Sequence, residues 1–259
     1  MSHTAKAFEK GKALIAFLTA GDPSVEDSIQ YVLDMEEAGA DLIEIGVPFS
    51  DPAADGPVIM AADQRALEKG VCLPVVLDEV RAIRKESRIP IVLLTYYNPV
   101  FTYGAEAFFK VCEEIGIDGV IIPDLPLEEQ GEVRPYADKH HVDVIQLVAP
   151  TSEDRIRTIA KTATGFIYVV SSMGVTGMRD GIKTNLKDII DVIRDTTDVP
   201  CAVGFGIHTP EQAEAIAKEA DGVITGSAVV DIIARKKTEA KEELQQYIGA
   251  MKAAVKKAE

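Results

Sequence analysis

The chain is poor in positive charge. Its 259 residues include 27 lysine and arginine residues against 42 aspartate and glutamate residues, which gives a formal net charge of −15. Nucleic acids and anionic membranes are bound by basic surfaces, so this charge argues against both as partners. A small phosphate ligand stays compatible with it, because the backbone N–H groups at the start of a helix can hold an anion without basic side chains.

Cysteines and long apolar runs are also scarce. Cys72, Cys112 and Cys201 lie far apart and form no CxxC motif, so neither a disulfide framework nor a metal site is predicted. The segment Met1–Lys12 lacks the apolar stretch of a signal peptide. The longest apolar runs are far shorter than the roughly 20 residues that a membrane span needs. We therefore expect a soluble protein of a reducing compartment, the cytoplasm.

Short runs rich in valine, isoleucine and leucine alternate with segments of helical period. Such runs are typical of strands covered on both faces. The eight expected strands are Ala13–Leu18, Asp41–Ile45, Ile89–Tyr96, Gly119–Ile122, Val142–Leu147, Phe166–Val170, Pro200–Val203 and Gly222–Thr225. No linker interrupts the pattern, which predicts a single-domain (β/α)₈ barrel over residues 1–259. A doubly wound open sheet is the alternative, and in either fold the chemistry belongs at the carboxyl ends of the strands.

Several helix boundaries can be expected from the sequence. Asp22 followed by Pro23 suggests an N-cap with proline at the first helical position. The run Thr209–Gln212 has the form of a capping box. Gly39 and Gly116 stand where helices should end before the next strand.

Two carboxylates follow the second expected strand. Glu44 interrupts an apolar run and shares a strand face with Leu42, so alternation places both either inside the barrel or outside it. A carboxyl group inside the barrel loses hydration, which raises its pKa and suits a group that both donates and accepts a proton. Asp55 lies in the proline-stiffened loop that follows and could complete an acid–base pair. The alternatives are a structural glutamate and an aspartate that only forms a turn.

Glycine-rich turns follow the last three expected strands. They are Gly174–Gly177, Gly204–Gly206 and Thr225–Ser227. Barrels often bind phosphate with the loops after the last two strands and a helix start. Ordinary tight turns are the alternative. No expected strand carries a lysine, which argues against a Schiff-base mechanism.

These motifs together resemble those of the alpha subunit of tryptophan synthase. The similarity runs from residue 13 to about residue 235, and the stretch Glu44–Pro52 together with Ala54–Pro57 is highly specific. The matching segments are Leu18–Pro23, Ile43–Pro52, Ala54–Pro57, Tyr96–Pro99, Pro123–Pro126, Gly174–Gly177, Gly204–Ile207 and Thr225–Ala228. The resemblance favours the barrel over the open sheet.

The resemblance implies a lyase that cleaves indole-3-glycerol phosphate to indole and glyceraldehyde 3-phosphate. Glu44 matches the acid–base residue of the family and Asp55 matches its second carboxylate, which stabilises charge at the indole N–H. The matching phosphate-binding residues are Gly177, Gly206, Gly226 and Ser227. The residues that match the indole pocket and its surroundings are Phe17, Leu94, Tyr96 and Tyr168.

The family resemblance also implies a partner, the pyridoxal-phosphate beta subunit, in an alpha2beta2 heterotetramer. Pro52, Asn98 and Pro126 match the family's contact surface. The pyridoxal phosphate belongs to the partner, so no cofactor is expected in this chain. Two departures are a short segment before the first strand and Ser172, which stands where many members have arginine.

Three other functions stay open at this point. The chain could be a stand-alone indole-releasing lyase, or a non-catalytic barrel that binds the phosphate ligand and activates a beta subunit. Retention of both Glu44 and Asp55 argues against the non-catalytic form. Another phosphate-binding barrel enzyme, such as a sugar-phosphate isomerase, would share the glycine turns but would not need the loop Pro48–Pro52.

Overall fold

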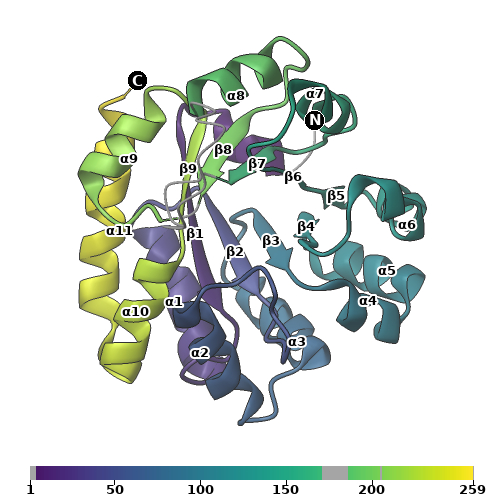
Figure 1. Ribbon diagram of the computed structural model, residues 1–259. Helices are drawn as coiled ribbons and strands as arrows, with labels where there is room; N and C mark the ends of the chain where they lie inside the picture. The colour runs from purple at the N-terminus through teal and green to yellow at the C-terminus, as the bar shows by residue number, and fades with distance from the viewer. Residues whose placement is uncertain (1–3, 171–185, 205, 259) are drawn as a thin grey trace.

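A computed structural model describes residues 4–170, 186–204 and 206–258. Within these residues the strands form one parallel sheet with helices arranged around its outside (Figure 1). The sheet order is β5-β4-β3-β2-β1-β9-β8-β7-β6, so the first strand pairs with the last one. That pairing excludes the doubly wound sheet, in which the first and last strands do not meet. The two ends of the order, β5 and β6, follow each other directly in the chain, so the strands form a nearly closed barrel.

Most strands are followed by one or two helices along the chain. The strands are β1 (Ala13–Thr19), β2 (Leu42–Gly46), β3 (Ile91–Leu94), β4 (Gly119–Ile121), β5 (Asp143–Val144), β6 (Gln146–Val148), β7 (Ile167–Val170), β8 (Cys201–Gly204) and β9 (Gly222–Thr225). The α-helices are α1 (Val25–Glu37), α2 (Pro57–Leu67), α3 (Leu73–Ile83), α4 (Tyr97–Tyr103), α5 (Ala105–Ile115), α6 (Arg134–Lys139), α7 (Glu153–Ala160), α8 (Leu186–Arg194), α9 (Pro210–Ala217), α10 (Ser227–Lys236) and α11 (Lys241–Lys256). Three 3₁₀ helices, η1 (Thr4–Phe8), η2 (Leu127–Glu132) and η4 (Lys237–Glu239), complete the described elements.

The fifth expected strand, Val142–Leu147, is divided in the structure. Its first part, β5, pairs with β4, and its second part, β6, pairs with β7. Ile145 joins them, and its N–H donates to the Val120 carbonyl. The described residues therefore contain nine strands in place of the expected eight, because the chain changes its partner strand at the point where the barrel closes.

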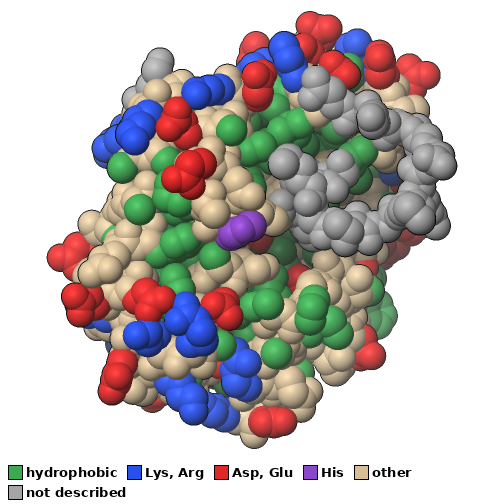
Figure 2. Space-filling model, turned by 60° about the vertical axis from the view of Figure 1, so that its left-hand side comes forward, with side chains coloured by type: hydrophobic (Ala, Val, Ile, Leu, Met, Phe, Trp, Pro, Cys, Tyr) green, Lys and Arg blue, Asp and Glu red, His purple; other side chains and the backbone are tan. Residues whose placement is uncertain are grey.

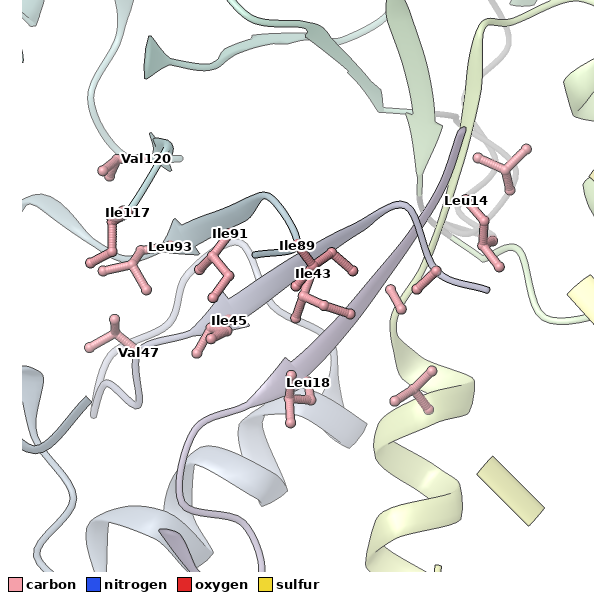
Figure 3. Close-up of a cluster of buried hydrophobic side chains, with 14 of the residues drawn as sticks. Leu14, Leu18, Ile43, Ile45, Val47, Ile89, Ile91, Leu93, Ile117 and Val120 are labelled. Carbon is pink, nitrogen blue, oxygen red and sulfur yellow. The ribbon is translucent and has the colours of Figure 1, made fainter. Parts of the chain in front are cut away.

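Each strand is buried on both faces. Side chains facing the helices form the larger core, which includes Ile43, Ile45, Ile91 and Leu93 of β2 and β3 (Figure 3). A second cluster fills the barrel interior with Ile15, Leu42, Val92, Ile121, Ile145, Phe166, Tyr168, Ala202 and Ile224. Leu42 thus faces inward, which places Glu44 on the interior face two residues further along β2.

The amino-terminal end of the barrel is covered by a short segment. Before β1, the described residues include the five-residue helix η1. Phe8 of η1 packs against Phe166 with ring centroids 5.7 Å apart. The candidate site lies at the opposite end of the barrel, at the carboxyl-terminal ends of the strands.

The helix boundaries agree with the sequence at three places and differ at one. Thr209 and Gln212 form the expected capping box, Gly116 ends α5 in the left-handed conformation and Gly39 adopts a φ of 110°. The expectation for Asp22 was wrong. Ser24 is the N-cap of α1, and its hydroxyl accepts from the Asp27 N–H at 3.1 Å.

Asp22 is held by a partner distant in sequence. Its carboxylate accepts two hydrogen bonds from the guanidinium of Arg65 on α2, at 2.9 and 2.6 Å. This bidentate pair ties the loop after β1 to the helix after β2. The Asp22 carboxylate therefore joins the loop after β1 to α2, and Ser24 caps α1 in its place.

The outer surface is mixed in charge. On the face shown in Figure 2, acidic and basic side chains are interspersed. Among the described residues, no helix is long and apolar enough to cross a membrane.

Candidate active site

Glu44 lies at the carboxyl-terminal part of β2 and points into the barrel. In the sheet register it stands beside Phe17 of β1 and Val92 of β3. Only 1% of its surface is exposed, and within the described residues its Oε2 atom has no hydrogen-bond partner. Burial, with a smaller contribution from the charge of Asp55, raises the pKa of Glu44 to about 8. The group is therefore protonated at neutral pH and able to act as an acid.

Asp55 lies half-buried in the loop between β2 and α2, and Tyr96 fixes its side chain. The Tyr96 hydroxyl donates to Asp55 Oδ2 at 2.8 Å and accepts from the Ala54 N–H at 2.9 Å. Burial raises the pKa of Asp55, and the bond from Tyr96 partly opposes the rise. The two bonds to one hydroxyl hold the carboxyl group and its own loop in a single position.

Tyr96 is itself held by an aromatic contact. Its ring stacks on Phe49, with centroids 5.2 Å apart and an interplanar angle of 26°. Burial and the neighbouring Asp55 both raise the pKa of Tyr96, so its hydroxyl keeps its proton and remains a donor. The sequence placed Tyr96 near an indole pocket, and the structure shows it bonded to the second carboxylate.

Tyr168 of β7 belongs to the interior cluster and approaches Gly204 of β8. A Cβ atom at Gly204 would lie 2.3 Å from the Tyr168 hydroxyl oxygen, so only glycine leaves room for this hydroxyl. Burial, followed by the charges of Glu44 and Asp55, raises the pKa of Tyr168. The structure thus places Tyr168 in the same electrostatic environment as both carboxyl groups.

Phe17 and Leu94 meet in one apolar cluster at the ends of β1 and β3. Phe17 packs with Ala62 and Val230, and Leu94 and Ile59 pack against them. The ring of Phe17 also covers Gly46, where a Cβ atom would lie 2.6 Å from it. These side chains form an apolar wall beside the strand ends, of the kind that a flat aromatic ligand needs.

The phosphate-binding candidates lie on adjacent loops. Gly206 follows β8 with a φ of 79° and is exposed. Gly226 is the N-cap of α10, and the exposed Ser227 begins this ten-residue helix. No side chain caps α10 among the described residues, so its first N–H groups are open to a ligand. Gly177 and Ser172 lie outside the described residues.

The three residues expected at a partner surface are not equally accessible. Asn98 on α4 and Pro126 before η2 are exposed, whereas Pro52 is buried. Among the described residues, no group of three or more His, Cys, Asp or Glu side chains could hold a metal ion.

Asp63 is a further carboxyl group at this mouth that sequence reasoning missed. It lies on α2, only 4% exposed, on the same helix face as the buried Ala62 and Ala66. Burial and the charge of Asp55 raise its pKa to about 7, and the backbone of Phe49 partly opposes the rise. A charged residue on the apolar face of a helix is the signal that could have revealed it.

The buried carboxyl groups predict a pH dependence of stability. The pKa rises from an ordinary 4.5 to about 8 in Glu44 and to about 8 in Glu79, a buried residue of α3 that accepts from Ser28 at 2.7 Å. The folded chain holds protons that the unfolded chain releases near pH 4.5. Their stabilising contribution is complete below this pH and is lost as the pH rises through 8. We expect the melting temperature to fall between about pH 5 and pH 9, and Glu79→Gln to reduce the fall.

Comparisons with known proteins show the family of this chain. A sequence profile of the tryptophan synthase alpha chain family matches residues 3–258. The tryptophan synthase alpha chain of Lacticaseibacillus casei is 49% identical over 255 residues, which cover 98% of this chain and 96% of the relative. That of Lactiplantibacillus plantarum is 52% identical over 235 residues, covering 90% and 89%.

Solved structures give the same result. Tryptophan synthase subunit alpha from Legionella pneumophila superposes with a TM-score of 0.88 at 34% identity, covering 99% of both chains. A chain of tryptophan synthase from M. tuberculosis superposes with a TM-score of 0.88 at 33% identity, covering 98% of this chain and 100% of that one.

Proposed function

Since the chain belongs to the tryptophan synthase alpha chain family, we propose that it cleaves indole-3-glycerol phosphate to indole and glyceraldehyde 3-phosphate. The observation that carries the proposal is Glu44, a buried carboxyl group at a strand end whose pKa is raised to about 8. A group that is protonated at neutral pH and close to ionisation can donate a proton and take one back within one turnover.

Glu44 supplies the proton transfers of the cleavage. Its acid form protonates C3 of the indole ring, which makes the ring an electron-accepting indolenine cation. The bond between C3 and the carbinol carbon then breaks, and its electron pair restores the aromatic ring. The carbinol hydroxyl becomes the aldehyde and gives its proton to the Glu44 carboxylate. The acid is regenerated, so the cycle needs no cofactor in this chain.

Asp55 stabilises the positive charge that develops on the indole ring. As the indolenine cation forms, the N–H of the ring becomes more positive, and a fixed carboxylate that accepts its hydrogen bond lowers the barrier. The bond from Tyr96 keeps this carboxylate in place before substrate arrives, so little reorganisation is needed during the reaction.

The remaining site residues match the two ends of the substrate. The Phe17 and Leu94 cluster offers an apolar wall for the indole ring. Gly206, Gly226 and Ser227 offer backbone N–H groups for the phosphate, with Gly177 as a further candidate on sequence grounds. The net charge of −15 repels a phosphate ester, so the phosphate must be bound by local donors such as these backbone N–H groups.

We propose that the indole passes to a beta subunit in an alpha2beta2 heterotetramer in the cytoplasm. The large exposed hydrophobic side chains of the described residues support a partner at the mouth of the barrel. They are Val58 and Met60 on α2 and Phe101 on α4, exposed by 37, 47 and 66%. Both helices follow strands of the site, and α4 also carries the exposed Asn98.

Phe101→Ala tests this docking surface. We expect the variant to keep the activity of the isolated chain but to need about tenfold more beta subunit for half-maximal stimulation, because an exposed aromatic side chain is a common interface anchor. The measurement is indole release against beta-subunit concentration. Lys85→Ala, an exposed position beyond the end of α3, is the control and should behave as wild type. Equal stimulation of wild type and Phe101→Ala would place the interface elsewhere.

The function itself is tested by indole release from indole-3-glycerol phosphate, measured with the purified chain alone and with a beta subunit. Release that increases when the beta subunit is added supports the proposal. Full release without a partner would show a stand-alone lyase. Stimulation of the beta reaction with no release of indole under either condition would show the non-catalytic activator.

A further inference from the structure

Thr225, the last residue of β9, makes two hydrogen bonds that no step of the proposed reaction uses. Its side chain is fully buried. The Thr225 hydroxyl donates to the Ile207 carbonyl at 3.2 Å and lies 2.7 Å from the hydroxyl of Tyr247 on α11. A threonine hydroxyl has one proton, and it is used toward Ile207. Tyr247 is therefore the donor of the second bond, and the three groups form a directed chain.

This chain of hydrogen bonds links the two loops assigned to the phosphate. Ile207 follows Gly206 directly, and Thr225 precedes Gly226 directly. The register between β8 and β9 pairs Ala202 with Gly222 and Val203 with Val223. These pairs end before the last residues of the two strands, Gly204 and Thr225. Beyond that register, the bond from Thr225 to Ile207 connects the two loops.

Tyr247 extends the link to the carboxyl-terminal helix. Its ring packs on the outer core, and burial raises the pKa of its hydroxyl, which keeps its proton. Phe17 lies beside the same turn, since a Cβ atom at Gly226 would be in ordinary van der Waals contact with it, 3.4 Å from the Cβ of Phe17. The turn that begins α10 is thus linked through Thr225 to the loop after β8 and to α11.

We propose that Thr225 and Tyr247 are positioning residues that set the spacing of the Gly206 and Gly226 loops for a phosphate monoester. The inference rests on the proposed function, whose phosphate-binding residues it concerns. A phosphate held by N–H groups from two loops needs both sets at hydrogen-bond distance at once, so a small displacement of one loop weakens binding of the phosphate end alone. The carboxyl groups of Glu44 and Asp55 lie on other elements, and of the apolar wall only Val230 belongs to α10. We therefore expect the chemistry at the carboxyl groups to be unchanged.

Thr225→Val and Tyr247→Phe test the proposal with little change of shape. We expect each to raise KM for indole-3-glycerol phosphate about tenfold with kcat within about twofold of wild type, and to weaken binding of glycerol 3-phosphate about tenfold, which is the loss of roughly one hydrogen bond. Binding of indole, which lacks a phosphate, should not change. Thr225→Ser keeps the hydroxyl, so its KM for indole-3-glycerol phosphate and its affinity for glycerol 3-phosphate should equal those of wild type.

Tyr31→Phe is the matched control. Tyr31 is a buried tyrosine whose hydroxyl accepts from the Ala240 N–H at 3.4 Å and donates to the Lys237 carbonyl, near the start of α11 but away from the phosphate loops. Its loss should lower the melting temperature without changing KM. If Tyr247→Phe and Tyr31→Phe lower stability alike and neither changes glycerol 3-phosphate binding, the positioning role is wrong.

The two readouts separate this proposal from the proposed function. If wild type releases no indole but the variants still lose affinity for glycerol 3-phosphate, the positioning role stands and the lyase assignment fails. If wild type releases indole and the variants bind glycerol 3-phosphate as tightly as wild type, the lyase assignment stands and the positioning role fails. No binding of glycerol 3-phosphate by wild type would overturn the phosphate site and this inference together.

Discussion

Glu44→Gln is expected to reduce indole release by about 10³-fold, at the upper part of the range for loss of a general acid–base group. Glutamine has nearly the same shape but can neither protonate C3 of the indole ring nor take the proton of the carbinol hydroxyl. The measurement is kcat for indole release, with and without a beta subunit. KM should change little, because the side chain is removed from the chemistry and not from the phosphate or the apolar wall.

Glu79→Gln is the control for this experiment. Like Glu44, Glu79 is 1% exposed and has a pKa raised to about 8 by burial, but it lies on α3 and bonds to Ser28. Both variants should stabilise the fold above about pH 8, since each removes a buried group that ionises there. Only Glu44→Gln should lose activity. Equal activity of the two variants would show that Glu44 is a structural residue of the barrel mouth.

Asp55→Asn is expected to reduce kcat by about 10²-fold, as is typical when a fixed group that stabilises charge in the transition state is removed. Asparagine keeps an oxygen for the bond from Tyr96 but has no negative charge for the ring N–H. The same substitution removes the smaller of the two contributions to the raised pKa of Glu44, the charge of Asp55, and leaves the effect of burial. The residual activity should therefore decline at a lower pH than in wild type, because Glu44 loses its proton earlier.

Tyr96→Phe tests the position of the Asp55 carboxylate without changing its charge. The carboxylate remains, but its bond at 2.8 Å is lost, and the Ala54 N–H loses its acceptor. A loss of about tenfold in kcat, smaller than that in Asp55→Asn, agrees with a positioning role for the hydroxyl.

A pH–rate profile of Asp55→Asn that coincides with wild type would contradict the electrostatic coupling of Asp55 to Glu44.

The local sequence pattern by itself predicted the strands, the shared face of Leu42 and Glu44, and the candidate phosphate turns. Runs of branched residues predicted the strands, alternation placed Leu42 and Glu44 on one face, and the glycine turns predicted where a phosphate could bind. These features depend on neighbours within a few residues, and their physical causes are strand geometry and backbone freedom. The motif Ile43–Pro52 then identified the family and with it the closed barrel.

Only the tertiary structure decided the contacts between residues far apart in the chain. The bond from Tyr96 to Asp55 and the pair of Arg65 with Asp22 each join elements that follow different strands. Asp63 is buried because α2 packs against β1 and α10. The division of the fifth strand also depends on its two partner strands, β4 and β7. A pKa or a hydrogen bond depends on what the whole fold brings close and on how much water it excludes, and neither is a property of the local sequence.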